Sequence, residues 1–475
     1  MRRLVLGLVL AAAFVPAAFA DYTVSGRFLY VDREFDLSGF TGVEPQRPIR
    51  FADVQIIDGA KIVGAGVTDA GGNFFLSVQD TRVRDIYVRC LARRQTSTGM
   101  PIDVRAGNQS GDIWAIRTQT FTGHAPDQDL FIGTLVAVPE AGGEAFNLLD
   151  DAIMGSDYLA ALRGAGSAPL LIVVFNAANP NLSSFNPSNN TITQARNAGY
   201  DDTVMLHEMG HYVVSNFSAT DSNGGTHRLS DCNQNLMLAF EEGHATFWGQ
   251  SVRRFFNLPH SSAYVRTTGQ AGPGNLQFSF DVETQQPFVC LGATSETTVF
   301  AALWDIVDRA GTPDESPGSE EPWDLMQAAD PDYWRVMTSY LPGAVNISLE
   351  DFWDGWFHPA IANGRHPEMV STWREIGVEY FQDGFEPNDV VAEAWPLAPG
   401  PVLRHQTFFA DRDGDLLGGP DTDFFSFDAV AGATYTIETL GLLGDANTAL
   451  ELRDTDGTTV LASNDNRSAS DASSL

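Results

Sequence analysis

The sequence is short of positive charge, of cysteine and of long apolar runs. Lys and Arg number 28 against 61 Asp and Glu, which gives a formal net charge of −33 at pH 7 and a pI near 4.4. Nucleic acids and anionic membranes attract basic surfaces, so this balance argues against both as partners. An excess of carboxylates can instead bind Ca²⁺ outside the cell, and calcium is one expectation of this composition.

One apolar run, residues 4–19, stands at the N-terminus, and no second run follows it. It is short for a membrane span, which needs about 20 apolar residues. Two arginines precede the run, and it ends in the small-residue pattern Ala-Phe-Ala at residues 18–20. These features predict a bacterial-type secretory signal peptide over residues 1–20, cut before Asp21, and a secreted protein without a membrane span.

Cysteine is scarce, with three residues in the chain: Cys90, Cys232 and Cys290. In an exported protein this number allows one disulfide and leaves one thiol over. Cys232 and Cys290 flank the segment to which we assign chemistry below and are the expected pair. Cys90 lies in an apolar segment that is typical of a buried strand. None of the three has the spacing of a zinc finger.

The remaining composition, 43% hydrophobic and 19% charged over 475 residues, is that of a globular protein of two or three domains. Residues 21–138 show short apolar runs between Gly- and Asp-rich turns and predict a β-sandwich. Residues 139–382 carry mainly helical patterns, with a clear β segment at 169–175. Residues 190–195 suggest either an edge strand that pairs with an extended substrate or a plain strand or loop. Residues 383–475 return to β patterns, so the expected fold is multidomain, with an α+β domain between two β-sandwiches.

The residues that carry chemistry centre on a single HExxH pattern, formed by His207, Glu208 and His211 within a helical segment. Residues four positions apart lie on one face of a helix, about 6 Å apart along its axis. Both imidazoles can therefore bind one zinc ion, with Glu208 beside a water molecule held there. The plainer interpretation is a surface helix with two histidines, but the pattern arises by chance in roughly one chain of this length in a hundred.

Two histidines leave a zinc site one protein ligand short. The helical segment that follows offers two adjacent glutamates, Glu241 and Glu242. At helical spacing Glu242 shares a face with Ala245 and Gly249, whose small size lets this helix approach the histidine helix closely. Glu241 shares its face with the bulky Trp248. We therefore expect Glu242 to be the third ligand, with Glu241 as the alternative.

The HExxH followed downstream by Glu242-Gly-His-Ala resembles the gluzincin metallopeptidases, whose third zinc ligand is that glutamate. The resemblance implies a zincin-like domain over residues 139–382. It implies that His207, His211 and Glu242 bind zinc and that Glu208 is the catalytic base for hydrolysis of protein or peptide substrates. No third histidine follows at the position that metzincins use.

The groups that support the ligands are less defined. A histidine bound to metal usually donates its other ring N–H to an acceptor. Thermolysin-like sequences have an Asp four residues after the ligand glutamate, where this chain has Thr246. Asp305 is a candidate acceptor, with an ordinary amphipathic helix as the alternative. Gluzincins generally stabilise the oxyanion with Tyr or His, and Tyr264, His260 and His244 all remain open for this role.

Two further segments resemble accessory modules. The strand–turn–strand pattern at 66–75, with residues 24–27 ahead of it, resembles the transthyretin-like or carboxypeptidase-regulatory-like β-sandwich. The segments 386–389, 421–427 and 454–457 resemble, in this order, the bacterial pre-peptidase C-terminal domain. Members of that family continue into a closing strand where this chain ends, so we expect the β-sandwich of residues 383–475 to be incomplete.

Calcium has two candidate positions in this last segment. Glu386, Asn388 and Asp389 resemble calcium-binding positions of related collagen-binding modules. Residues 411–415 carry alternating carboxylates like part of a calcium loop, without the downstream glutamate of an EF-hand. A solvated acidic turn is the alternative for both.

The leading hypothesis is a secreted zinc metallopeptidase. One alternative is an exported adhesion or matrix-binding protein with an inactive peptidase domain, although the intact HExxH and Glu-Gly-x-Ala patterns argue against decay. Another is a zinc hydrolase of a non-peptide substrate such as an ester or a cell-wall amide. The sequence defines neither the cleavage specificity nor the oligomeric state.

Overall fold

The computed structural model describes most of the chain between Ala20 and Asp465. The described residues are 20–97, 99–164, 166–175, 182–272, 274–308, 326–380, 383–398, 400, 407, 421–440, 442 and 448–465. The expected signal peptide, apart from Ala20, and the acidic segment 411–415 lie outside these residues. Among the described helices, none combines the length and apolar character needed to cross a bilayer.

The chain forms two compact units, and each of them consists of segments that are not consecutive in the sequence. Unit 1 comprises Met1–Val31, Gln46–Ala92 and Trp114–Gly143, and unit 2 comprises Asp32–Pro45, Arg93–Ile113 and Glu144–Leu475. The expected limits were 138/139 and 382/383, whereas residues 139–143 fall in unit 1 and residues 383–475 fall in unit 2. The segments 32–45 and 93–113, which those limits placed in the first domain, also fall in unit 2. Both segments pair with or pack on distant strands of unit 2, which a local sequence pattern does not reveal. The chain is multidomain and mixes β-sheets with helices.

Unit 1 consists of two sheets. In the first, β1 is bordered by β7 and β4, both antiparallel to it, and by β13, which is parallel to it. The second has the order β11-β8-β5-β6, with β12 also paired to β8. The strands of the first sheet are β1 (Ala20–Val31), β4 (Gln46–Pro48), β7 (Asn73–Asp80) and β13 (Leu130–Ala137). Those of the second are β5 (Asp53–Asp58), β6 (Lys61–Val67), β8 (Arg84–Leu91), β11 (Ala115–Arg117) and β12 (Phe121–His124).

Strand β7 of unit 1 alternates strictly between exposed and buried residues, as a strand with one face on a core does. In β7 the side chains of Phe74, Leu76 and Val78 are buried while their neighbours are exposed. Phe28 of β1 stacks on Phe74 with ring centroids 5.3 Å apart. Cys90 is a free, buried thiol in β8.

Unit 2 contains a five-stranded sheet of order β15-β16-β14-β10-β9. Its strands are β9 (Arg93–Arg94), β10 (Ile102–Ala106), β14 (Leu171–Phe175), β15 (Ser184–Asn186) and β16 (Thr191–Gln194). β14 runs parallel to both neighbours, and its apolar sequence suits a strand covered on both faces. The segment for which either an edge strand or a plain strand or loop was expected forms β16. This strand does not lie at the edge of the sheet, because β15 pairs along its outer side.

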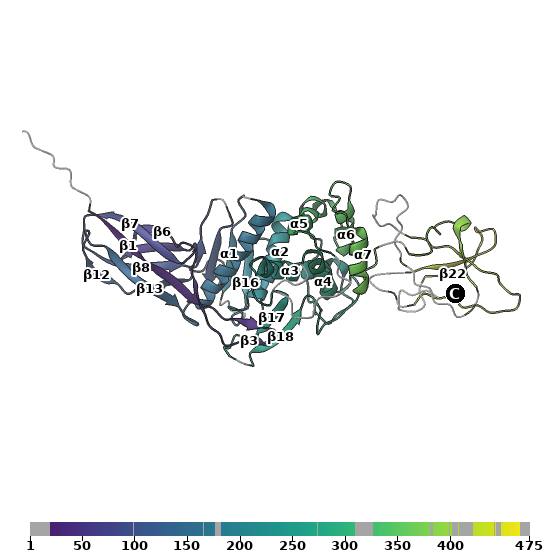
Figure 1. The fold of residues 1–475 in the computed structure, drawn as a ribbon, viewed down its shortest axis with the longest axis horizontal. Helices are drawn as coiled ribbons and strands as arrows, with labels where there is room; N and C mark the ends of the chain where they lie inside the picture. Colours follow the sequence, from purple (N-terminus) through teal and green to yellow (C-terminus); the bar gives the residue numbers. More distant parts are fainter. Residues whose placement is uncertain are drawn as a thin grey trace, which may run out of the picture. The chain divides into compact units, whose positions relative to one another are not determined.

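Unit 2 also contains the α-helices labelled in Figure 1. They are α1 (Gly143–Arg163), α2 (Asp202–Phe217), α3 (Leu236–Phe255), α4 (Glu296–Val307), α5 (Asp330–Ser339), α6 (Leu349–Phe357) and α7 (His366–Glu375). α3 packs against α2 on one side and α4 on another. Asn235 caps the N-terminus of α3, because its side chain accepts hydrogen bonds from the backbone N–H groups of Met237 and Leu238.

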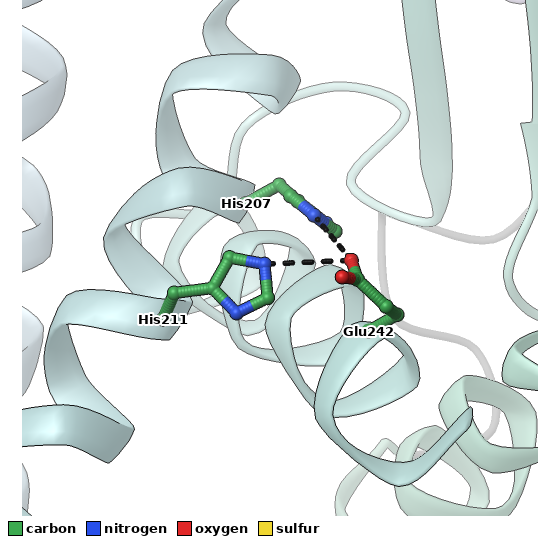
Figure 2. A group of neighbouring side chains, drawn as sticks. All are labelled: His207, His211 and Glu242. Atoms are coloured by element: carbon green, nitrogen blue, oxygen red, sulfur yellow. Dashed lines mark ion pairs between the residues drawn. The ribbon is translucent and has the colours of Figure 1, made fainter. Parts of the chain in front are cut away.

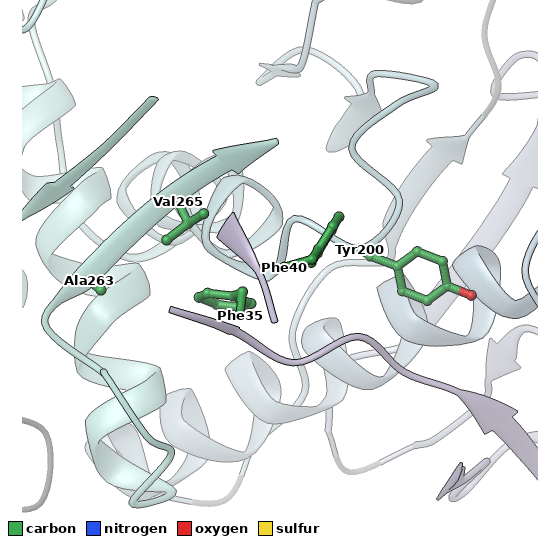
Figure 3. Close-up of a cluster of buried hydrophobic side chains, with 5 residues drawn as sticks. All are labelled: Phe35, Phe40, Tyr200, Ala263 and Val265. Carbon is green, nitrogen blue, oxygen red and sulfur yellow. The ribbon is translucent and has the colours of Figure 1, made fainter. Parts of the chain in front are cut away.

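A hairpin from the N-terminal part of the chain completes the core of unit 2. It consists of β2 (Phe35–Asp36) and β3 (Gly39–Phe40) and packs on the sheet of β17 (Ala263–Thr267) and β18 (Leu276–Asp281). Figure 3 shows Phe35 and Phe40 of the hairpin beside Val265 of β17. The guanidinium of Arg33 lies 4.6 Å from the ring centroid of Tyr200 and donates to the carbonyl of Gly269.

Beyond residue 383 the described residues form short ladders rather than a closed sandwich. β19 (Trp395–Pro396) pairs in parallel with β20 (Phe425–Ser426), and β21 (Leu450–Arg453) pairs in antiparallel with β22 (Val460–Asn464). The contacts of this segment group it with unit 2.

We expect Phe40→Ala to destabilise unit 2 by about 3–5 kcal/mol, because the ring is 4% exposed and its removal leaves a cavity. Urea-induced unfolding of the full-length protein measures the change. Val345→Ala, at a side chain in the same unit that is 76% exposed, is the control and should shift the free energy of unfolding by less than about 0.5 kcal/mol. Equal effects of the two substitutions would contradict a core role for the hairpin.

Candidate metal centre

Helices α2 and α3 pack with very little space between their backbones. A Cβ atom at Gly210 would lie 2.7 Å from the Cα of Ala245, and one at Gly249 would lie 3.1 Å from the backbone nitrogen of His207. Both distances are shorter than ordinary van der Waals contact, so a larger residue at Gly210 must push the helices apart. The structure thus confirms the close approach that small residues on the Glu242 face predict.

His207, His211 and Glu242 point toward one another across this helix contact (Figure 2). The Nε2 atoms of His207 and His211 lie 3.2 and 3.4 Å from Oε2 of Glu242. In a tetrahedral site with metal–ligand bonds of about 2.0–2.1 Å, neighbouring ligand atoms are about 3.3 Å apart. The three side chains are 12%, 12% and 9% exposed, so the point between them is largely shielded from solvent. The group therefore fits a divalent metal ion.

The other ring nitrogens of the two histidines also face acceptors. Nδ1 of His207 lies 3.0 Å from Oγ1 of Thr246, and Nδ1 of His211 lies 3.5 Å from Oε1 of Glu241. Acceptors at Nδ1 favour the tautomer whose Nε2 lone pair is available to a metal. Thr246 thus stands where thermolysin-like sequences have Asp, and Glu241, the alternative ligand, faces His211 from the side. Thr246 and Glu241 thus face the Nδ1 atoms, which is the acceptor role for which Asp305 was a candidate in the sequence.

Charges in this group act strongly on one another. Burial raises the pKa of Glu208, whose side chain is 7% exposed. Burial acts in the same direction on Glu242, but His211 and His207 outweigh it and hold the pKa of Glu242 well below its usual range. Burial alone would lower the pKa of His211, yet Glu242 and Glu241 raise it well above its usual range. The Glu242 carboxylate is thus favoured in its ionised form beside the imidazole of His211.

The three residues considered for the oxyanion lie in different surroundings. The ring of Tyr264 in β17 meets that of His207 edge-on, with centroids 6.2 Å apart. His244 is fully buried and is hydrogen-bonded to the Tyr333 hydroxyl, and burial lowers its pKa to about 3. His260 is exposed in a turn with a φ of 53°. Of the three, Tyr264 is in ring contact with His207.

A residue that the sequence analysis did not select, His227, also reaches the group. Its Nε2 lies 3.4 Å from Oε2 of Glu242, and its Nδ1 lies 3.0 and 3.1 Å from the two carboxylate oxygens of Glu296. The bond to Glu296 raises the pKa of His227 to about 9 despite partial burial. His227 lies in a Gly- and Ser-rich segment without periodicity, so no local sequence signal identifies it.

The first turn of α2 is held by a buried carboxyl group. Asp201 accepts hydrogen bonds from the backbone N–H and the hydroxyl of Thr267, at 3.1 and 2.6 Å. Its side chain is removed from water, with the residue 2% exposed. This desolvation outweighs the hydrogen bonds and raises the pKa of Asp201 to about 6.

A second acidic group lies in the C-terminal segment. Carboxylate oxygens of Glu386, Asp421 and Asp423 lie within 4.8 Å of one another. Burial and the neighbouring Asp421 raise the pKa of Asp423 to about 7. The sequence pattern groups Glu386 with Asn388 and Asp389 and does not connect it with the two later aspartates. This group could hold a cation.

The comparisons with known proteins leave this site without an assigned activity. No protein-family model matches the chain. Over 203 residues the chain is 25% identical to an uncharacterized protein of Archaeoglobus fulgidus, a match that covers 42% of this chain and 54% of the relative. The chain thus spans about half the length of that relative.

Among solved structures, the chain is similar to a 9R-lipoxygenase from Cyanothece PCC8801, with a TM-score of 0.17 and 13% identity, covering 33% of this chain and 26% of that one. A TM-score this low carries no argument about fold or activity.

Gly210→Ala should weaken metal binding at this centre, because the added methyl group meets the Ala245 backbone and moves the two histidines away from Glu242. We expect an affinity loss of about 10–100-fold, similar to that caused by disturbing the groups around a ligand. Competition with a chromogenic chelator measures it. Ser215→Ala, at an exposed position of the same helix, should leave the affinity unchanged, and a parallel loss there would contradict this explanation.

Asp201→Asn should make the protein less sensitive to pH. The pKa of Asp201 is raised from 3.8 to about 6, so the folded state holds a proton that the unfolded state releases between these values. Stability of the wild type therefore falls as pH rises through this window, by about 3 kcal/mol in total. The difference in unfolding free energy between variant and wild type should move in favour of the variant from pH 4 to pH 7. A constant difference would show that Asp201 is ionised throughout.

Proposed function

We propose that this protein is a secreted zinc metallopeptidase of the gluzincin type, which hydrolyses peptide bonds in protein substrates. The observation that carries the proposal is the convergence of His207, His211 and Glu242 on one point, with Glu208 on the same helix as the two histidines. Two nitrogen ligands and one carboxylate leave a fourth position open, as catalytic rather than structural zinc sites do.

In this proposal each residue has one task. His207, His211 and Glu242 would hold zinc, which when bound supplies a Lewis acid that polarises a carbonyl and acidifies water. Glu208 takes the proton of the attacking water and then delivers it to the departing amine. Its burial keeps bulk water from competing for that proton. Thr246 and Glu241 orient the two imidazoles through their Nδ1 atoms.

The two alternative functions use the same metal ligands but differ in whether a substrate is hydrolysed and in which substrate it is. An adhesion or matrix-binding protein with an inactive peptidase domain would bind zinc without turnover. A hydrolase of esters or cell-wall amides would turn over a small substrate and leave proteins intact. The completeness of the ligand set favours an active enzyme, and the nature of the products separates peptidase from other hydrolase.

Glu208→Gln should retain one zinc per chain and lose proteolysis by several orders of magnitude, because the amide cannot accept the proton of water. The measurement is digestion of an unfolded protein by zinc-loaded enzyme, with new N-termini identified by mass spectrometry and zinc counted by elemental analysis. Zinc-loaded wild type without new N-termini would reject the peptidase assignment. Equal activity of the variant would show that Glu208 is not the base.

Glu242→Gln and Glu241→Gln form a matched pair at adjacent positions. Glu242→Gln should lose zinc together with activity, because it removes a charged ligand. Glu241→Gln should keep stoichiometric zinc, with affinity reduced by no more than about 10–100-fold, because its carboxylate only faces His211 Nδ1. The reverse pattern would make Glu241 the ligand.

A further inference from the structure

We propose that His227 is a catalytic residue of this centre, which donates a hydrogen bond from Nε2 to the substrate oxygen that becomes negative during hydrolysis. We further propose that Glu296 and the Cys232–Cys290 disulfide hold it in place. The inference rests on the proposed function and adds a residue that neither the HExxH pattern nor the downstream glutamate identifies.

The ring of His227 stands between two carboxylates. Its Nδ1 faces both oxygens of Glu296 at 3.0 and 3.1 Å, and its Nε2 faces Oε2 of Glu242 at 3.4 Å. Ligand atoms of His227, Glu242 and Glu296 lie within 4.8 Å of one another, so these three residues could also hold a cation, but the two carboxylates face different nitrogens of the ring. The two contacts of Nδ1 with Glu296 fix the direction of the ring. The geometry thus orients Nε2 of His227 toward the metal centre.

His227 is also the most accessible imidazole of the group. Its side chain is 32% exposed, against 12% for His207 and for His211. A group that contacts substrate must be reachable from solvent, whereas a group that only supports a ligand can be buried. Glu296, which orients the ring, is itself 2% exposed. A buried carboxylate behind a partly exposed histidine is the arrangement that fixes a donor in one direction.

The segment that carries His227 has no regular structure of its own between the end of α2 and the start of α3. Hydrogen bonds tie it instead to the first residue of α4 and to the residues just before this helix. Gln234 donates to a carboxylate oxygen of Glu296 at 3.0 Å, and its backbone N–H donates to the carbonyl of Thr294 at 2.7 Å. The Thr294 hydroxyl donates to the carbonyl of Cys232 at 2.9 Å. All these contacts link the His227 segment to the residues around Glu296.

The Cys232–Cys290 disulfide also links these two segments, in this case covalently. Cys232 lies in the His227 segment and Cys290 lies shortly before Glu296 in the chain, with their Cα atoms 5.4 Å apart. An imidazole that must stay aligned with a developing charge loses effect when its backbone moves by about 1 Å. Reduction of this bond should therefore lower turnover without removing any metal ligand, and the active form should be favoured in oxidising surroundings.

The first experiment compares wild type, His227→Ala and Thr226→Ala, each loaded with zinc, by steady-state kinetics and by zinc titration. Thr226 is an exposed neighbour of His227, and its variant should match the wild type. His227→Ala should keep one zinc per chain with nearly unchanged affinity and lose about 10²–10³-fold in kcat, the effect of removing one oxyanion donor. Its KM should change little.

Binding of a phosphonamidate peptide, which carries a tetrahedral anion, gives a readout that does not depend on turnover. We expect calorimetry to show that His227→Ala weakens this probe by about the same factor as kcat/KM. Unchanged kcat would overturn the proposal. Loss of zinc from His227→Ala would overturn it as well, because His227 would then support the ligand Glu242. Wild type that holds zinc and neither cleaves protein nor binds the probe would reject the proposed function and the donor together.

The role of Glu296 and of the disulfide in positioning His227 is tested on the same zinc-loaded protein. Glu296→Gln, reduction of the wild type, and the double variant C232S/C290S should each lower kcat while zinc content stays at one per chain. Addition of reductant to C232S/C290S should have no further effect, which separates the disulfide from other targets of the reductant. Full activity of the folded double variant would show that the disulfide does not position His227.

Discussion

The close contact between α2 and α3 is the constraint on which the candidate centre depends. Gly210 against Ala245, and Gly249 against the backbone of His207, bring two helices together at distances that no larger side chain allows. Only this spacing lets Glu242 of one helix meet both histidines of the other. The small residues that face each other on the two helices therefore allow His207, His211 and Glu242 to meet.

Around this contact the fold gathers charge that would be unfavourable without partners. Glu208, Glu242 and Glu296 are all buried, and a buried carboxylate is stable only where it is protonated, hydrogen-bonded or paired with positive charge. The imidazoles provide this pairing in the structure, and in the proposed enzyme a metal ion would share it. The same arrangement explains why His227, although it comes from an irregular segment, has a defined orientation.

The two units are interleaved in sequence, so the centre depends on residues far from it in the chain. Strand β10 enters the sheet of unit 2 beside β14, and the hairpin with Phe35 and Phe40 covers β17, the strand that carries Tyr264. A fold assembled in this way couples the stability of the candidate site to segments that precede it by more than a hundred residues, such as the hairpin at 32–45.

Local patterns in the sequence were enough to identify the histidine helix, the face of small residues on α3 that carries Glu242 and the strand at β14, because each depends on the spacing of neighbouring residues along one element. They could not identify His227, the place of Thr246 and Glu241 beside the ring nitrogens, the assignment of segments 32–45 and 93–113 to unit 2, or the position of β15 outside β16. These features depend on contacts between residues distant in the chain, which periodicity does not encode. The sequence by itself therefore determined the proposed ligands, and only the tertiary structure decided what surrounds them.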